Sequence, residues 1–263
     1  VGNENVTISG NGVSNAGALT GAGTASLAGN VTLGAASRIG TTNAASSLTL
    51  GGTVNGAFAL TAVGAGTVAL NGVVGGTTPL ASLSQGATVP LRIGTNSVTT
   101  TGAQAYAGPL TLASDVTLRS TANGAITLAN VIGGGFDINA MTGGATTLNN
   151  RPGVDAVTTD APGSVTLNGN VLASTVTIGE AAPSVCGQVG NGGGSVSFAG
   201  AISLCGTTTV SATDAQFNGA IDSNAGGARA LTVNASGTTN FIGLAGATRA
   251  LASLTTNGTG VSR

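Results

Sequence analysis

Short runs of alternating apolar and hydroxyl-bearing residues recur along the whole chain. In a typical run one Thr separates two apolar residues, as in Val31–Leu33, Leu48–Leu50 and Ile126–Leu128. Successive side chains of a strand point to opposite faces, so this alternation predicts short, half-buried strands. Gly, Asn and Ser cluster between the runs and turn the chain at low steric cost. Because no segment of about ten or more residues has helical apolar spacing with a cap, we predict almost no helix.

Whole phrases are repeated as well. GGTTPLASLS at residues 75–84 and GATRALASLT at residues 246–255 agree at six of ten positions. A second pattern, in which a bulky residue and Ala-Gly precede an apolar–hydroxyl–Leu triplet, occurs as LAGNVTL (27–33), YAGPLTL (106–112) and FAGAISL (198–204). Such repeats decide the fold class before any local pattern does.

These spacings predict about three units of roughly 80–90 residues within one domain that spans residues 1–263. The units cover residues 24–101, 102–193 and 194–256, and the middle unit carries an insertion near residues 151–192. We expect the Gly-rich stretch EAAPSVCGQVGNGGG, residues 180–194, to protrude from this insertion as a loop.

Two all-β architectures fit units of this size. Immunoglobulin-like sandwiches usually have a large aromatic core residue, whereas only 2% of this chain is aromatic and Trp is absent. A parallel β-helix instead stacks short strands around a narrow aliphatic column, which suits Leu, Val, Ile and Ala. We therefore predict an all-β parallel β-helix, or β-solenoid, with about thirteen coils of about 20 residues each.

The low charge of the chain narrows its possible partners. Charged residues make up 6% of the sequence, against about 25% in ordinary domains. No run of about 18 apolar residues is present, so we expect no membrane insertion. The seven basic residues are all Arg and are scattered, so the phosphate-neutralising patch of a nucleic-acid-binding protein is missing and we expect no nucleic acid partner.

Cys186 and Cys205 are the two cysteines of the chain. Two thiols allow one disulfide, which would close a loop of about 18 residues, and the alternative is two unpaired thiols. A metal site needs more ligands than this, and the chain has no His to supply them. We therefore expect no metal site.

A catalytic site in a β-helix would need carboxylates clustered on one face. The chain has eight carboxylates, most of them 20 or more residues apart: Glu4, Asp115, Asp137, Asp155, Asp160, Glu180, Asp214 and Asp222. Asp155 and Asp160, with Arg151 nearby, form the one close pair, which could act as acid and base at a suitable separation. The alternative is a solvated loop. We predict that the protein is not an enzyme and keep a polysaccharide-active β-helix enzyme as a remote alternative.

Three other binding motifs are weak. The Gly-rich stretches at residues 21–26 and 190–195 lack the Lys of a phosphate-binding loop. The stretch GGGFDIN at residues 133–139 has an Asp but not the Gly spacing of a calcium-binding β-roll. The runs Thr99–Thr101 and Thr207–Thr209 do not make the flat two-column array of an ice-binding face, because strand side chains alternate.

Longer phrases resemble the repeats of very large bacterial exoproteins. They are VTTTGAQAYAGPLTLASDVTL (98–118), LTLGGTVNGAFALTAVGAGTVALNGVVGGTTPLASL (48–83) and LTVNASGTTNFIGLAGATRALASLT (231–255). Over residues 24–255 the chain is similar to filamentous-haemagglutinin-like and autotransporter-like adhesins with β-strand repeats. This resemblance implies a secreted, right-handed parallel β-helix at the cell surface, without a cofactor and without catalytic positions. The two cysteines and the insertion depart from the family pattern.

We expect a structural or adhesive rod segment, extracellular or at the bacterial cell surface. Its partner would be a host-cell, neighbouring-cell or matrix surface, with Arg229 and Arg249 as candidate contacts or simply as solvated side chains. The alternative is a subunit of an extracellular filament or sheath that associates head to tail with its own copies. The ends of a β-helix expose unpaired strands, and a net charge of −1 gives little repulsion between copies.

Overall fold

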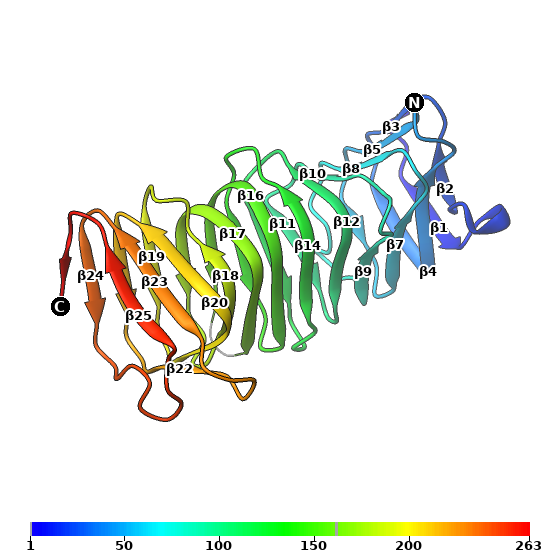
Figure 1. Ribbon diagram of the computed structural model, residues 1–263. Coiled ribbons are helices and arrows are strands. Elements are labelled where there is room, and N and C mark those ends of the chain that lie inside the picture. Colours follow the sequence, from blue (N-terminus) through cyan, green and yellow to red (C-terminus); the bar gives the residue numbers. More distant parts are fainter. Residues whose placement is uncertain (1, 161–162) are drawn as a thin grey trace.

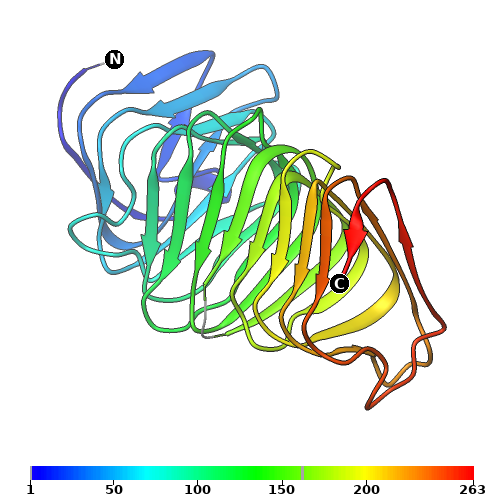
Figure 2. The same ribbon diagram turned by 90° about the vertical axis from the view of Figure 1, so that its left-hand side faces the viewer.

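The chain forms a parallel β-solenoid of about 12 turns (Figure 1). The structure is a computed structural model that describes residues 2–160 and 163–263, with the backbone alone at residues 150–152. The predicted all-β, right-handed parallel β-helix is confirmed, and the number of turns is close to the thirteen expected. The chain winds from one end of the rod to the other, so its two termini lie at opposite ends (Figures 1 and 2).

Strands from successive turns stack into three parallel ladders, which we call faces A, B and C. Face A contains β1 (Val6–Gly10), the start of β4 (Val31–Thr41), β6 (Val54–Asn55), β11 (Ser97–Thr100), β13 (Val116–Ser120), β15 (Ile138–Met141), the ends of β16 (Ala145–Thr159) and β17 (Ser164–Ile178), β19 (Ser195–Phe198), β21 (Asp214–Phe217), β24 (Thr238–Phe241) and β26 (Val261–Ser262).

Face B contains β2 (Leu19–Gly21), the end of β4, β7 (Ala59–Val63), β9 (Ser82–Gln85), the starts of β12 (Gln104–Leu112), β14 (Ile126–Ile132), β16, β17, β18 (Ser184–Val189) and β20 (Ile202–Ala212), and β22 (Ile221–Ser223). Face C contains β3 (Thr24–Leu27), β5 (Ser47–Leu50), β8 (Thr67–Leu70), β10 (Leu91–Ile93), the later parts of β12, β14, β18 and β20, the middle parts of β16 and β17, and then β23 (Ala230–Ala235) and β25 (Ser253–Asn257).

Helix is almost absent, as predicted, at about 1% of the chain. The single helical element in the part of the chain that the structure describes is the short 3₁₀ turn η1 (Val13–Asn15). It lies in the loop between β1 and β2 and projects at the N-terminal end of the rod (Figure 1).

Inward-facing residues form columns that run the length of the rod. The best example, on face A, has one residue per turn: Val6, Val31, Val54, Val74, Val98, Leu118, Ala140, Thr159, Ile178, Phe198, Phe217 and Phe241. The column ends in a stack of three Phe rings with centroids 5.4 and 5.1 Å apart. Each fully buried apolar side chain of the column stabilises the fold by about 1.5–3 kcal/mol by leaving water. The hydrophobic core therefore extends along the axis of the rod, and each turn packs mainly on its two neighbours.

A polar cluster interrupts the aliphatic core in the last part of the N-terminal half. Gln104 and Tyr106 are fully buried, and the Tyr106 hydroxyl donates to Gln104 Oε1 at 2.8 Å. Gln104 Nε2 in turn donates to the carbonyl oxygens of Arg119 and Val98 at 2.9 and 3.2 Å. Burial raises the pKa of Tyr106 far above its ordinary value, so this phenol stays neutral and keeps donating.

The three copies of the Ala-Gly phrase lie at three different corners of the solenoid. LAGNVTL carries the chain from face C to face A, YAGPLTL from face B to face C, and FAGAISL from face A to face B. The similarity therefore follows a corner and the strand after it, not a fixed position in the turn. The bounds of the three predicted units stay a prediction.

The Gly-rich stretch at residues 180–194 does not protrude as a loop. Its middle part is strand β18, which pairs with β17 on one side and β20 on the other. Val185 and Val189 are fully buried in the core. The expectation of a protruding loop was wrong because Val185 points into the core from face B and Val189 from face C. Gly187, with a φ of +97°, turns the chain at the corner between them.

Candidate functional site

The structure separates the carboxylate pair suggested by the sequence. Asp155 is exposed, and Asp160 is half-buried at the other end of the same extended stretch. Five strand residues span about 16 Å, whereas the two acids of a glycoside-cleaving pair lie about 5–9.5 Å apart. The side chain of Arg151 lies outside the described residues. These groups are therefore not brought together as an acid–base pair.

Most of the scattered acids instead fasten one turn to another. Asp115 Oδ1 accepts from the backbone N–H of Asp137 at 3.0 Å, and Asp137 Oδ1 accepts from Ala156 N–H at 2.9 Å. Asp214 Oδ1 accepts from Thr238 N–H at 2.7 Å. Asn5 and Asn30 do the same at the first turns. The wide spacing of these acids in the sequence thus corresponds to the length of one coil. An Asp or Asn directly before an apolar strand is the sequence signal that could have predicted these hydrogen bonds between turns.

One acid is buried. Glu180 is 1% exposed, and Thr159 Oγ1 donates to its Oε2. Burial raises the pKa of Glu180, the hydrogen bond from Thr159 opposes that change, and the nearby charge of Asp160 adds to it. Thr159 belongs to the inward column of face A. The Glu180 carboxyl group therefore accepts the hydrogen bond of a polar residue that is buried in the core.

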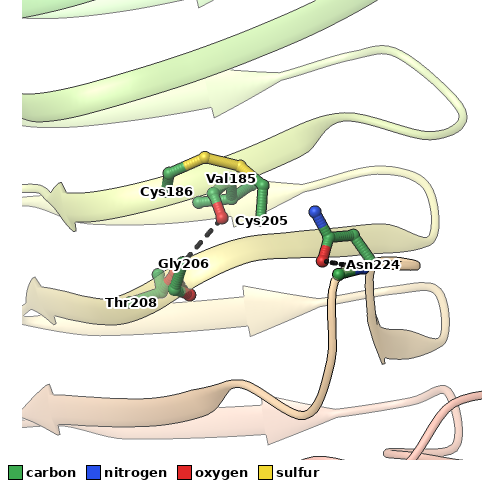
Figure 3. The surroundings of a disulfide bond; sticks show 7 residues. Val185, Cys186, Cys205, Gly206, Thr208 and Asn224 are labelled. Carbon is green, nitrogen blue, oxygen red and sulfur yellow. Dashed lines mark hydrogen bonds between the residues drawn. A yellow bond between two sulfur atoms is a disulfide. The ribbon is translucent and has the colours of Figure 1, made fainter.

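Cys186 and Cys205 form a disulfide between neighbouring turns of face B (Figure 3). Their Cα atoms are 5.1 Å apart, and the bridge closes a loop of 19 residues in sequence. Just inside it, Thr208 Oγ1 donates to the carbonyl oxygen of Val185 at 3.2 Å (Figure 3). The two bonds together tie β18 to β20 beside the core.

The remaining candidates are separate features. Thr100 and Thr208, the middle residues of the two Thr runs, are buried. Arg249 is exposed, while Arg229 is half-buried and donates from Nη2 to the carbonyl oxygen of Gly226 at 3.2 Å. In the described part of the chain, no three His, Cys, Asp or Glu side chains gather where they could hold a metal ion.

None of the helical residues that the structure describes forms a segment able to span a bilayer.

An open groove of about 530 Å³ crosses the last turns of face C, where this face meets face A. We call it the axial groove, because its walls come from successive turns. Six side chains that line it carry amides or hydroxyls: Asn191, Ser211, Asn234, Ser236, Asn257 and Thr259. Its floor is made of small residues, among them Ala212 and Ala235, which are almost fully buried.

The axial groove is the strongest candidate for a binding site, and sequence reasoning missed it. Ser211, Asn234 and Asn257 stack directly on one another through the register of β20, β23 and β25. They are 23 residues apart, so only the winding of the chain brings them into one line. No family model, curated protein or solved structure matches the chain.

Proposed function

We propose that the chain is a structural and adhesive rod segment, displayed outside a bacterial cell, that binds a host-cell, neighbouring-cell or matrix surface. The observation that supports this is the continuous stack of about 12 turns with one inward column. Each turn rests mainly on its neighbours, so a rod grows without a new core. At about 4.8 Å per turn its length is about 55 Å. The outer surface has few charges and many hydroxyl groups, so the rod can contact another surface along its whole length.

The test couples the rod to beads and measures their attachment under flow to epithelial cells, bacterial cells and surfaces coated with matrix protein. The control is Leu83→Asp, which puts a charge in the buried core and should unfold the stack. Attachment by the native chain alone supports the proposal. Equal attachment by the two, or none by either, contradicts it. Antibody labelling of intact producing cells tests the location.

A second candidate function, assembly through the ends of the rod, is favoured by the exposed last turn. Large apolar side chains gather there: Ile242, Leu244, Leu254 and Val261 are 41–71% exposed. Within the described residues β25 and β26 each pair with a strand on one side only. At the other end η1 projects past the first turn (Figure 1), and a copy docking head to tail would have to accommodate it.

Sedimentation at rising concentration tests assembly. Filaments that disappear in Leu254→Lys and persist in Ile132→Lys, a matched change of an exposed apolar side chain on the side of the rod, support stacking through the C-terminal end. A monomer at every concentration contradicts it.

A further inference from the structure

We propose that the axial groove binds a neutral polysaccharide. The inference rests on the proposed adhesive function and gives it a site and a ligand class. The groove crosses four successive turns, with Asn191, Ser211, Asn234 and Asn257 contributing one polar side chain each. A long ligand laid along the axis of the rod would meet each of them in order.

The chemistry of the lining matches hydroxyl groups rather than charges. Among the described residues that line the groove none is charged, so nothing there attracts a phosphate, a sulfate or an ammonium group. A side-chain amide offers two donors and an acceptor, and a Ser hydroxyl offers both functions. Sugar hydroxyls likewise donate and accept, so each rung can exchange hydrogen bonds with a neutral sugar.

Three of these polar side chains are free for a ligand, whereas Asn191 and Thr259 already hydrogen-bond within the protein. Within the part of the chain that the structure describes, the side-chain amides of Asn234 and Asn257 and the hydroxyl of Ser211 have no protein partner. Other corner residues differ, since Asn30 and Asn55 both use their side-chain oxygens to accept backbone N–H groups of the next turn. Asn234 and Asn257 do not make such a hydrogen bond to the next turn. Their side-chain amides are therefore available to bind a ligand.

The spacing favours a ligand that repeats. Neighbouring strands lie about 4.8 Å apart, and the stacked register of Ser211, Asn234 and Asn257 presents a polar group at each interval. A polymer of hydroxyl-bearing rings can satisfy several rungs at once, and several weak contacts then add to useful affinity.

Small residues keep the groove open. Ala212 and Ala235 form its floor, and the turn at Gly258 lies directly over the carbonyl oxygen of Ala235. Gly258 has a φ of +128°, a conformation that favours glycine, and a Cβ there would overlap with that oxygen. The backbone at this point is therefore fixed close to the floor, with no bulky side chain to fill the space.

An extended peptide fits the groove less well. Peptides that bind β-proteins often add a strand to a free sheet edge, where main-chain groups are unpaired. Here β20 and β23 are paired on both sides, so their main-chain groups are already used. The free edge of β25 faces the end of the rod and not the groove.

The experiment measures retardation of the intact chain in native gels that contain dextran, laminarin, mannan or galactan. Alginate, an anionic polysaccharide, serves as the charge control. We expect retardation by at least one neutral polysaccharide and none by alginate. The variant Asn234→Ala/Asn257→Ala should lower the affinity at least about tenfold, as the loss of several hydrogen bonds predicts.

The matched control is Asn240→Ala, which removes an outward amide from β24, the last strand but one of face A, outside the groove. It should bind like the native chain. No retardation by any of the four neutral polysaccharides, or equal retardation of the double variant, would overturn the inference. If the double variant instead loses attachment only to surfaces coated with matrix protein, the ligand is a protein and the inference is also wrong.

The adhesion assay separates this inference from the proposed function. If the double variant attaches to cells as well as the native chain and polysaccharide binding is absent, the rod is adhesive through another surface and only the groove assignment fails. If the native chain binds polysaccharide but attaches to no surface, the groove assignment stands and the adhesive function fails.

Discussion

Two corners of the rod, residues 75–84 and 246–255, share a sequence and a local conformation but not their surroundings. Gly75 and Gly246 have φ of +69° and +70°. Gly75 N–H donates to the carbonyl oxygen of Val54, and Gly246 N–H to that of Ile221, both at 2.7 Å. The repeated phrase therefore specifies the same turn both times.

The two corners are also capped in the same way. Asn55 Oδ1 accepts from the N–H groups of residues 77 and 78 at 3.0 and 3.2 Å. Asp222 Oδ1 accepts from those of residues 248 and 249, both at 2.9 Å. In each case the capping side chain comes from the preceding turn. Asn55 is neutral and Asp222 is charged.

The two corners differ in the face of the solenoid that they lead into and in how far the next turn buries them. The first corner leads into β9 on face B, and the second leads into β25 on face C. Leu83 is 1% exposed because β12 stacks over it, whereas Leu254, at the matching position, is 41% exposed. The phrase thus determines the shape of a corner, and the neighbouring turns determine how much that corner contributes to stability.

The largest contrast should come from truncating the matched leucines. Leu83→Ala leaves a cavity between turns and should lower the free energy of unfolding by about 2–5 kcal/mol. Leu254→Ala should lower the free energy of unfolding by less than about 1 kcal/mol, because the Leu254 side chain is partly exposed and has fewer packing contacts to lose. Urea unfolding followed by far-UV circular dichroism measures the two. Similar losses would mean that the last turn is covered in solution.

The matched glycines should differ by less. A Cβ on Gly75 would overlap with the carbonyl oxygen of Thr99 in the next turn, whereas the nearest atom to a Cβ on Gly246 is Leu251 N at 3.2 Å. Gly246→Ala should therefore destabilise by about 1–2 kcal/mol, from its positive φ alone, and Gly75→Ala by more. Thermal unfolding of the two variants decides, and a greater loss for Gly246→Ala would contradict the comparison.

Glu180, buried within the rod, should make the stability of the fold depend on pH, with a smaller effect than either matched pair above. Because its pKa is raised in the folded chain, the fold favours the protonated form. Stability is fully present below the ordinary pKa and falls as the pH rises through the raised one. Glu180→Gln keeps the contact with Thr159 and should be the more stable protein at pH 7, with a flatter profile. The melting temperature measured from pH 4 to pH 8 is the readout.

Asp222, at the exposed corner, should give the smallest effect and the opposite sign. The N–H group of Arg249, helped by that of Thr248, holds the pKa of this carboxyl below its usual range, and burial opposes them. Its stabilisation is present above the ordinary pKa and is lost as the pH falls through the lowered one. Amide hydrogen exchange at Thr248 and Arg249 should therefore speed up at acid pH relative to Asp222→Asn. No pH-dependent difference between the two proteins would contradict this.

The sequence was a good guide to the strands and a poor one to the surface. The alternation in Val31–Leu33 and Ile126–Leu128 placed strands correctly because a strand needs only local information. The Gly-rich residues 180–194 misled us, since glycine permits a loop without requiring one. The axial groove could not be found, because Ser211, Asn234 and Asn257 are related by the winding of the chain and not by a motif.

The sequence by itself determined the class of fold and the conformation of each corner. Both follow from near neighbours, through side chains that alternate about a strand and glycines that accept a positive φ. The tertiary structure decided which face each phrase occupies. Turns along the face A column vary from 19 residues, between Ala140 and Thr159, to 25, between Val6 and Val31, so a spacing in sequence does not fix a place on the coil. Stacking across those unequal turns assigned the partners of each strand, buried Leu83 and left Leu254 exposed.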